Sequence, residues 1–453
     1  MSDVVIEDAA PTASELDAEA AYEKFVWDNL PRNFAGHFMH GMLGMTGFRL
    51  FNAPTFLPAY LHQISGGSDF MVGLGQSLQQ VGAVVSPIVG ATHIEHRKKV
   101  LPVSMLMGTM MRLGMLGISL AGWFLTGHMR AMLITTLVFL FLMGFFQGAQ
   151  GVAFQLLLAK VIPIKRRGIL QALRNVIGGV VAAGLSLVAG RYIIQPNLFG
   201  NGYATTFFLA VILTSAGLTA LAMLMKEPEP PTVREKSTIM ARVKDFPALI
   251  RSDRSFMFFM LAQLLSTAAR IAAPFYILSA GRVIHLDGKT LGVMSLAFLG
   301  ADTLTNMAWG YTGDKFGFRL TFILSLVLWA AATGLLIASP GLPAIHVGGI
   351  AIGAIGWIFI SFFGLGAAQS GQMMSSSTMV LEFGTREDMA MRLAFTQTAQ
   401  GLTASIGPLL GGLLVGAMGY NALFGVSMAF LVAGFFVLVT LVEEPRHRRN
   451  SAV

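Results

Sequence analysis

The sequence lacks cysteine altogether and has few charged residues. The absence of cysteine from 453 residues excludes disulfide bonds, thiolate metal sites and a catalytic thiol. Asp, Glu, Lys and Arg together make up 12% of the chain, whereas soluble domains carry about 25%. Because 54% of the residues are hydrophobic, a soluble fold would leave too little polar surface for water. The composition therefore predicts an integral membrane protein.

The start of the chain also lacks a basic stretch followed by an apolar run, so we expect no cleaved signal peptide. Residues 1–32 hold eight Asp and Glu instead. We interpret them as an acidic cytoplasmic tail.

What the sequence does contain is twelve apolar runs, and a helix of about 20 such residues crosses a bilayer. We place them at Asn33–Leu61, Asp69–Gly90, Val100–Gly127, Ala131–Leu158, Gly168–Tyr192, Tyr203–Met225, Phe256–Gly281, Leu291–Gly310, Leu320–Ala338, Ala344–Gln369, Met389–Met418 and Asn421–Leu441. They form two six-helix halves, 33–225 and 255–442, with a charged, proline-rich cytoplasmic loop at 226–254 and a basic tail at 443–453. The predicted fold class is an all-α membrane protein with twelve transmembrane helices in two pseudo-symmetric halves.

The basic residues lie mostly on one side of these spans. If both termini are cytoplasmic, that side holds 23 of the 31 Lys and Arg, and the outer loops hold four. Such a bias sets the orientation and requires an even number of spans. The formal charge of +8 therefore reflects topology and gives nucleic-acid binding no support. We expect a multi-pass monomer in a bacterial-type inner membrane, with both termini cytoplasmic.

The two halves are an internal repeat. Gly202-Tyr203, an apolar span and Glu227-Pro228 recur 217 residues later as Gly419-Tyr420, a span and Glu444-Pro445. In the same way, Arg49 and Pro54 in the first span match Arg270 and Pro274 in the seventh. Parallel repeats of this kind build a binding site near the midplane, and rocking of one half on the other gives alternating access. The repeat favours a transporter.

The loop after the eighth span carries a family motif. Gly310-Tyr-Thr-Gly-Asp314-Lys-Phe-Gly317-Phe-Arg319 resembles the loop signature of the major facilitator superfamily, and Gly90, Glu95 and Arg97 form a degenerate copy after the second span. This resemblance implies the superfamily fold, and it implies that these loop residues gate the cytoplasmic side. The alternative is that these charged loops only mark topology.

Two other motifs depart from the pattern of proton-driven drug exporters in that superfamily. Gly407-Pro408 stands in the eleventh span, whereas drug antiporters carry such a motif in the fifth. Gln147-Gly148 in the fourth span matches another motif, but Gly144 replaces its arginine. A multidrug or hydrophobic-compound exporter is therefore the second choice.

Five charges lie away from the ends of the predicted spans, and a charge near the bilayer centre costs roughly 2.5–3.5 kcal/mol on insertion scales. They are Arg49, Arg112, Arg174, Arg270 and Asp302. Arg49 and Arg270 would face each other across the pseudo-twofold axis, as in organophosphate antiporters that this arrangement resembles. Planar guanidiniums bind carboxylate or phosphate with two hydrogen bonds, so we expect an anionic substrate. The alternative is that both arginines hold the fold.

The other polar residues in the spans receive weaker assignments. Asp302 is a candidate proton carrier, or else a fixed partner of an arginine. Gln147 and Asn306 are candidates for hydrogen bonds to the substrate. We expect Arg112 and Arg174 to be structural, Arg174 by extending its head group to the membrane surface.

Other functions remain open. His37 and His40 share a helix face near several methionines, so a copper carrier is conceivable. A receptor or assembly factor on the same fold is a further alternative, because fold does not fix function. No nucleophile with a base, paired carboxylates or metal cluster appears, so we expect no enzyme and no cofactor.

Overall fold

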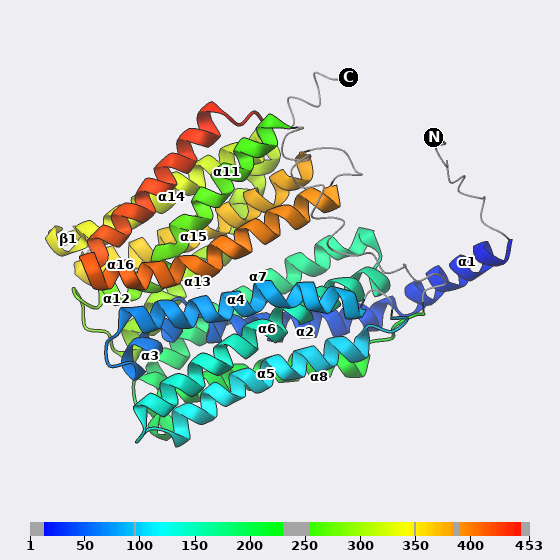
Figure 1. Ribbon diagram of the computed structural model, residues 1–453, viewed down its shortest axis with the longest axis horizontal. Coiled ribbons are helices and arrows are strands. Elements are labelled where there is room, and N and C mark those ends of the chain that lie inside the picture. Colours follow the sequence, from blue (N-terminus) through cyan, green and yellow to red (C-terminus); the bar gives the residue numbers. More distant parts are fainter. Residues whose placement is uncertain (1–12, 95–96, 230–252, 348–349, 384–388, 445–453) are drawn as a thin grey trace, which may run out of the picture.

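The structure is a computed structural model that describes residues 13–94, 97–229, 253–347, 350–383 and 389–444. Long helices lie side by side through almost all of it (Figure 1). They are α1 (Ala13–Asp28), α2 (Leu30–Phe51), α3 (Phe56–Ile64), α4 (Asp69–Ile94), α5 (Leu101–Phe124), α6 (Met129–Val161), α7 (Ile164–Ala189), α8 (Gly202–Leu224), α11 (Arg254–Ala269), α12 (Tyr276–Ala280), α13 (Gly288–Phe316), α14 (Phe318–Ala338), α15 (Ala354–Glu382) and α16 (Met389–Thr440). A two-stranded hairpin, β1 (Ile345–Val347) and β2 (Ile350–Ile352), precedes α15.

Twelve membrane crossings follow from these helices. Within the described ranges, eight helical segments are long and apolar enough to cross a membrane by length and composition. One of them, α16, bends at Gly419, where φ is 81°, and so contributes two crossings. The other three crossings are α4 and α13, which have 26 and 29 residues, and α2 together with α3; these carry more polar side chains. The predicted fold class is confirmed.

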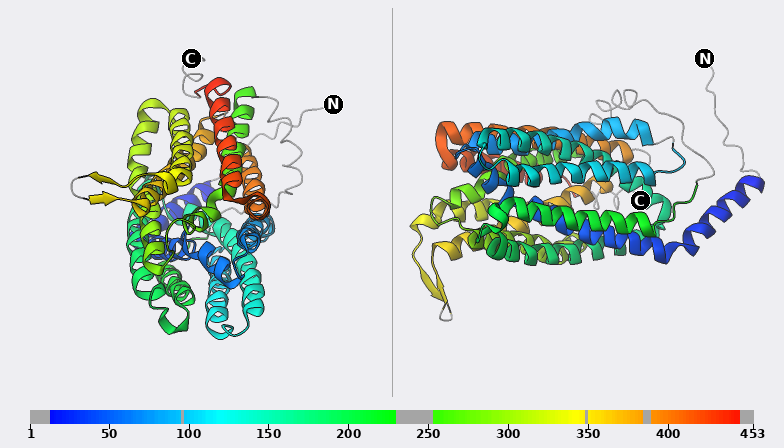
Figure 2. Two further views of the ribbon diagram at one scale, coloured as in Figure 1. Left: turned by 90° about the vertical axis from the view of Figure 1, so that its left-hand side faces the viewer. Right: turned by 90° about the horizontal axis from the view of Figure 1, so that it is seen from below.

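The helices pack as two groups of six crossings. Helices α2 to α8 contact one another, as do α11 to α16, and the two groups lie one above the other in Figure 1. Between the groups, α4 packs on α16 and α7 packs on α13. Seen along the helices in Figure 2 (left), the hairpin stands off from the bundle; the right-hand view shows α1 and the hairpin at opposite ends of the molecule.

The first and seventh crossings are both broken near their repeat-related prolines. The first is interrupted between the end of α2 and the start of α3, a stretch that contains Pro54. The seventh passes through a 3-10 turn, Arg270–Phe275, which contains Pro274. Proline has no N–H to donate and its ring clashes with the preceding turn, so each break follows from local chemistry.

The tenth crossing differs from the prediction. It was expected at 344–369, whereas α15 runs from Ala354 to Glu382 and the apolar residues before it form the hairpin. Two glycines at 348–349 between isoleucine and valine residues favour a tight hairpin turn over a helix. An apolar run by itself did not distinguish strand from helix. The central loop, predicted as a loop with a surface helix, lies mostly outside the described residues.

The end of the bundle that carries α1 is tied together by repeat-related glutamates. The Glu227 carboxylate accepts hydrogen bonds from the backbone N–H groups of Val100 (2.7 Å) and Leu101 (2.8 Å) at the start of α5, and it pairs with Lys160 at 3.0 Å. The Glu444 carboxylate, 217 residues later, lies against Gly317 at the start of α14. A carboxylate at a helix N-terminus satisfies free N–H donors and the positive end of the helix dipole.

We predict that Glu227→Ala destabilises the folded protein by about 3–5 kcal/mol, because it leaves Lys160 and two helix N–H groups without their shared partner. The Glu227 side chain is only 3% exposed. Glu229→Ala is the matched control, since Glu229 pairs with Lys99 at 57% exposure, where an ion pair contributes about 0–1 kcal/mol. Thermal unfolding of the purified variants in detergent measures both. Equal effects of the two substitutions would contradict the capping role.

Candidate substrate site

A cavity of about 650 Å³ lies between the two halves. Its lining comes from α2, α4, α5, α6 and α7 of the first half and from the broken seventh crossing, α13, α14 and α15 of the second. Both halves therefore contribute to one central space.

The end of the bundle opposite the termini is closed by direct contact between the halves. A Cβ atom at Gly190 would lie 2.7 Å from the Cα of Gly292, and one at Gly412 would lie 2.7 Å from the carbonyl oxygen of Asp69. Only glycine permits main chains to approach so closely. Thr55, in the break of the first crossing, adds a hydrogen bond of 3.0 Å to the carbonyl of Leu291 across the same interface.

An ion pair joins the halves at the level of the helix breaks. Arg49 Nη1 lies 3.1 Å from Asp302 Oδ2 on α13, and it donates to Thr303 Oγ1 at 3.1 Å. The two charged side chains are 19% and 13% exposed. Arg49 is in the last turn of α2, and Arg270 is the C-cap of α11. The negative end of a helix dipole stabilises a cation at such positions.

Three of the predicted binding residues, Arg49, Arg270 and Gln147, line this cavity, and so does Asp302, the predicted proton carrier. Asn306 is not brought into it, and its amide instead donates to the carbonyl of Asp302 one turn earlier on α13. This local bond is the usual alternative use of an amide in a helix.

The predicted gating residues lie away from the cavity. Gly310 and Asp314 are in the last turns of α13, and Gly317 follows with a φ of 92°. Arg319 donates to the carbonyls of Leu438 (2.9 Å) and Val439 (2.8 Å), which belong to its own half.

The degenerate copy of this motif is only partly visible. Gly90 is in α4, Arg97 is exposed, and Glu95 lies outside the described residues. Gating by either loop stays a prediction.

Sequence reasoning missed two arginines of the site. Arg112 and Arg174 line the cavity and are only 6% and 7% exposed. The expectation that Arg174 extends its head group to the membrane surface is wrong, because its guanidinium lies over the ring of Phe154, 4.9 Å from the centroid. The face of α6 formed by Gln147, Gln150 and Phe154 at spacings of three and four residues was the available signal.

His37 and His40, considered for copper, both pack on Phe154 with ring centroids 5.0 Å away. Among the described residues no group of three His, Cys, Asp or Glu side chains is arranged to hold a metal ion. Both rings make aromatic contacts with Phe154, and His40 also lines the cavity.

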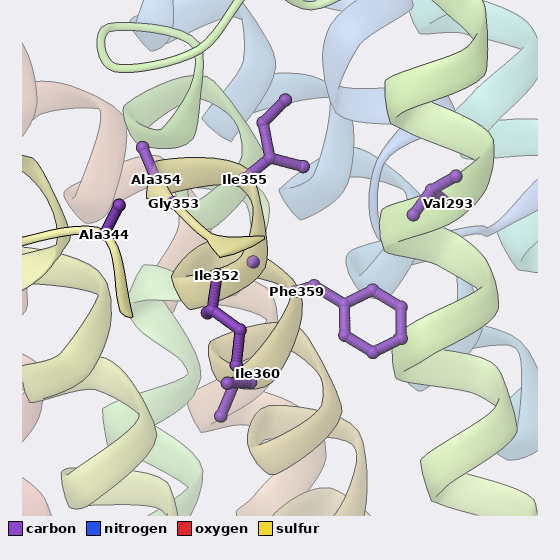
Figure 3. Close-up of a pocket in the computed structure, with 9 residues that line it drawn as sticks. Val293, Ala344, Ile352, Gly353, Ala354, Ile355, Phe359 and Ile360 are labelled. Atoms are coloured by element: carbon purple, nitrogen blue, oxygen red, sulfur yellow. The ribbon is translucent and has the colours of Figure 1, made fainter. Parts of the chain in front are cut away.

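A second recess lies at the end of the bundle that carries the hairpin. Figure 3 shows it between Val293 of α13, Ile352 of β2 and the first turns of α15, including Phe359. None of the nine described residues that line it has a polar side chain. It lacks the groups that would orient a polar solute.

The geometry defines a membrane protein of two six-helix halves around a central charged cavity, and comparison with known proteins identifies its family. The profile described as Major Facilitator Superfamily matches residues 39–301 and 258–453. The chain therefore belongs to the Major Facilitator Superfamily and is a transporter rather than an enzyme. The resemblance inferred from the motif is confirmed.

Solved structures share the fold at low sequence identity. A variant of the nucleoside transporter NupG is similar with a TM-score of 0.68 and 15% identity, covering 90% of this chain and 100% of that one. A D-xylose-proton symporter is similar with a TM-score of 0.65 and 14% identity, covering 92% of this chain and 98% of that one. A variant of the peptide transporter POT in complex with sulfate has a TM-score of 0.67 and 12% identity, covering 90% of this chain and 94% of that one. In a comparison with curated proteins, no match was found.

We predict that Arg49 and Asp302 are energetically coupled. A double-mutant cycle of Arg49→Gln and Asp302→Asn should give an interaction free energy of about 0.5–3 kcal/mol in thermal unfolding, as expected for contacting side chains. Arg130→Gln combined with Asp302→Asn is the control, because Arg130 is exposed outside the cavity. Additive effects for the first pair would show that the ion pair contributes nothing to stability.

Proposed function

We propose that this protein is a secondary active transporter that moves a small organic anion, bearing carboxylate or phosphate, by alternating access and with proton coupling. The observation that carries the proposal is the charge of the cavity. Four arginines and one aspartate line it, an excess of three positive charges when histidine is neutral. An uncompensated buried charge is costly, so an anion that neutralises it binds with a strong electrostatic gain.

The same charge disfavours the second candidate, an exporter of cationic or hydrophobic drugs. A cation would add a fourth excess charge to the cavity, whereas guanidiniums bind oxyanions through paired hydrogen bonds. A receptor or assembly factor on the same fold needs no such cavity, and binding of a small anion discriminates it from a transporter.

The contacts between the halves favour alternating access. The halves meet tightly at the end opposite the termini, and the cavity extends toward the end that carries α1. With both termini in the cytoplasm of a bacterial-type cell, as the positive-inside bias predicts, this conformation faces inward. Rocking about α4–α16 and α7–α13 would open the other end.

Asp302 is the proposed proton carrier. Among the described residues it is the one acid that lines the cavity, and protonation would break its ion pair with Arg49 and so free that guanidinium for the anion. The ion pair also joins the halves, so its loss would loosen their contact. Proteins of similar fold are described as a D-xylose-proton symporter and a proton-dependent oligopeptide transporter, which favours protons as the coupling ion.

We predict that anions stabilise the purified protein. Thermal shift should increase with carboxylates or phosphates and not with lipophilic cations, because bound ligand stabilises the folded state by mass action. Arg49→Gln and Arg270→Gln should each reduce the shift, and exposed Arg130→Gln should not. Stabilisation by cations alone would sink the proposal and favour a drug exporter.

We predict that Asp302→Asn uncouples transport from protons. In proteoliposomes loaded with the stabilising anion, the wild type should respond to an imposed pH gradient. The variant should still exchange anion across the membrane without that response, because a neutral amide holds no titratable proton. Glu229→Gln, an exposed acid, is the control. An unchanged response in Asp302→Asn would remove this residue from the coupling mechanism.

A further inference from the structure

A second group of positive side chains lies in the N-terminal half of the cavity. Arg112 comes from α5 and Arg174 from α7, and both are at least nine-tenths buried. Two glycines make room for them: a Cβ at Gly41 would fall on Arg174 Nε, and one at Gly108 would lie 3.0 Å from Arg112 Nη1. Helices α2 and α5 thus have no side chain at the positions that the guanidiniums occupy.

The partners of these two guanidiniums are neutral. Arg112 Nη1 donates to the carbonyl of Gly108 at 2.6 Å, and Arg174 Nη1 donates to Gln171 Oε1 at 3.1 Å. The Nε atoms of both arginines are buried without a hydrogen-bond partner. Within the described part of the chain, no carboxylate forms an ion pair with either, in contrast to Arg49. Their charges therefore remain uncompensated in a region of low dielectric.

Other polar atoms around them also lack partners. Both ring nitrogens of His40 and Oε1 of Gln147 are buried and unsatisfied, and both residues line the same cavity. Buried polar atoms without partners are rare in native proteins and call for an explanation. The Nε–H groups of both arginines are donors without partners beside two positive charges, which is the chemistry of an oxyanion site, whereas Gln147 Oε1 is an acceptor and takes no part in binding an oxyanion.

The distance between Arg49 and the Arg112–Arg174 group indicates how long a solute that contacts both must be. Arg174 crosses α2 at Gly41, eight residues before Arg49. That interval is about two helical turns, on the order of 10 Å along the axis. A single carboxylate cannot reach both groups, whereas a solute with an anionic group at each end can.

We propose that Arg112 and Arg174 form a second oxyanion subsite, which holds one carboxylate or phosphate of an elongated dianionic solute while the other binds at Arg49 and Arg270. This inference rests on the proposed function and names its substrate class. A dicarboxylate would neutralise two of the three excess positive charges, whereas a monocarboxylate would neutralise only one.

The experiment compares matched monoanions and dianions on the purified full-length protein by titration calorimetry. The probes are octanoate against suberate, and octyl phosphate against octanediol bisphosphate. In one of these pairs or both, the dianion should bind more tightly. Arg112→Gln and Arg174→Gln should each weaken dianion binding by about ten- to hundred-fold, the loss expected for hydrogen bonds to a charged group. They should weaken monoanion binding by a clearly smaller factor, because a monoanion at Arg49 and Arg270 loses only the longer-range attraction of the removed charge. Arg49→Gln should weaken both classes, and Arg130→Gln neither.

Equal dianion affinity in the wild type and the glutamine variants overturns the subsite. If those variants fail to fold, dianion binding to Arg112→Lys and Arg174→Lys tests the subsite instead, because lysine keeps the charge but lacks the planar guanidinium that donates paired hydrogen bonds. A roughly tenfold loss supports the subsite and no loss overturns it.

Inorganic phosphate separates the two sources of an oxyanion. Phosphate that competes with the dianion supports a subsite for the solute. Phosphate binding that depends on Arg174 but does not compete with the dianion overturns the assignment of this subsite to the solute. Monoanion binding that depends on Arg49 leaves the proposed function standing if only the subsite fails, and absence of any oxyanion binding to the wild type refutes both.

Discussion

The rest of the structure depends on one constraint, which is the free-energy cost of placing a guanidinium inside the hydrocarbon core of the bilayer. For Arg49 and Arg270 the chain meets this constraint by ending a helix beside the charge. Arg49 and Arg270 both stand at the C-terminal end of a helical segment, where free carbonyls and the helix dipole favour a cation. Backbone groups freed by each break must be satisfied inside the protein, because lipid offers no hydrogen bonds. The broken crossings therefore have to face the centre of the molecule, and a polar cavity follows from that requirement.

Each half is held as a unit by bonds at the end that carries the termini. Glu227 ties the start of α5 to Lys160 at the end of α6, and Arg32 donates to two carbonyls at the end of α8. Arg319 does the same for α14 and the end of α16. These bonds stay within a half, whereas Arg49 and Asp302 bond across the interface. Each half is thus braced internally at this end, which is a mechanical condition for rocking of the halves as rigid units.

Much of this architecture could be read from the sequence, because apolar length and repeated motifs are local properties. The matched Arg49–Pro54 and Arg270–Pro274 pairs revealed the repeat and placed two arginines at the centre, where both line the cavity, but the breaks beside the prolines were not predicted. Three-dimensional packing decided the rest. Arg112 was expected to be structural, and the sequence did not show that it lines the cavity, where Gly108 leaves room for its guanidinium. The hairpin before α15 was missed because a short apolar run has no unambiguous period.

The seal opposite the termini is made of main chain against main chain. At Gly73, Gly190 and Gly412 the two halves touch where a hydrogen atom is the whole side chain. Conformations of a transporter differ by only a few kcal/mol, so one methyl group at such a contact is large enough to change which conformation predominates at rest. If the protein works by alternating access as proposed, its resting direction depends on a few glycine positions, and a change at any of them would re-set it without touching a binding residue.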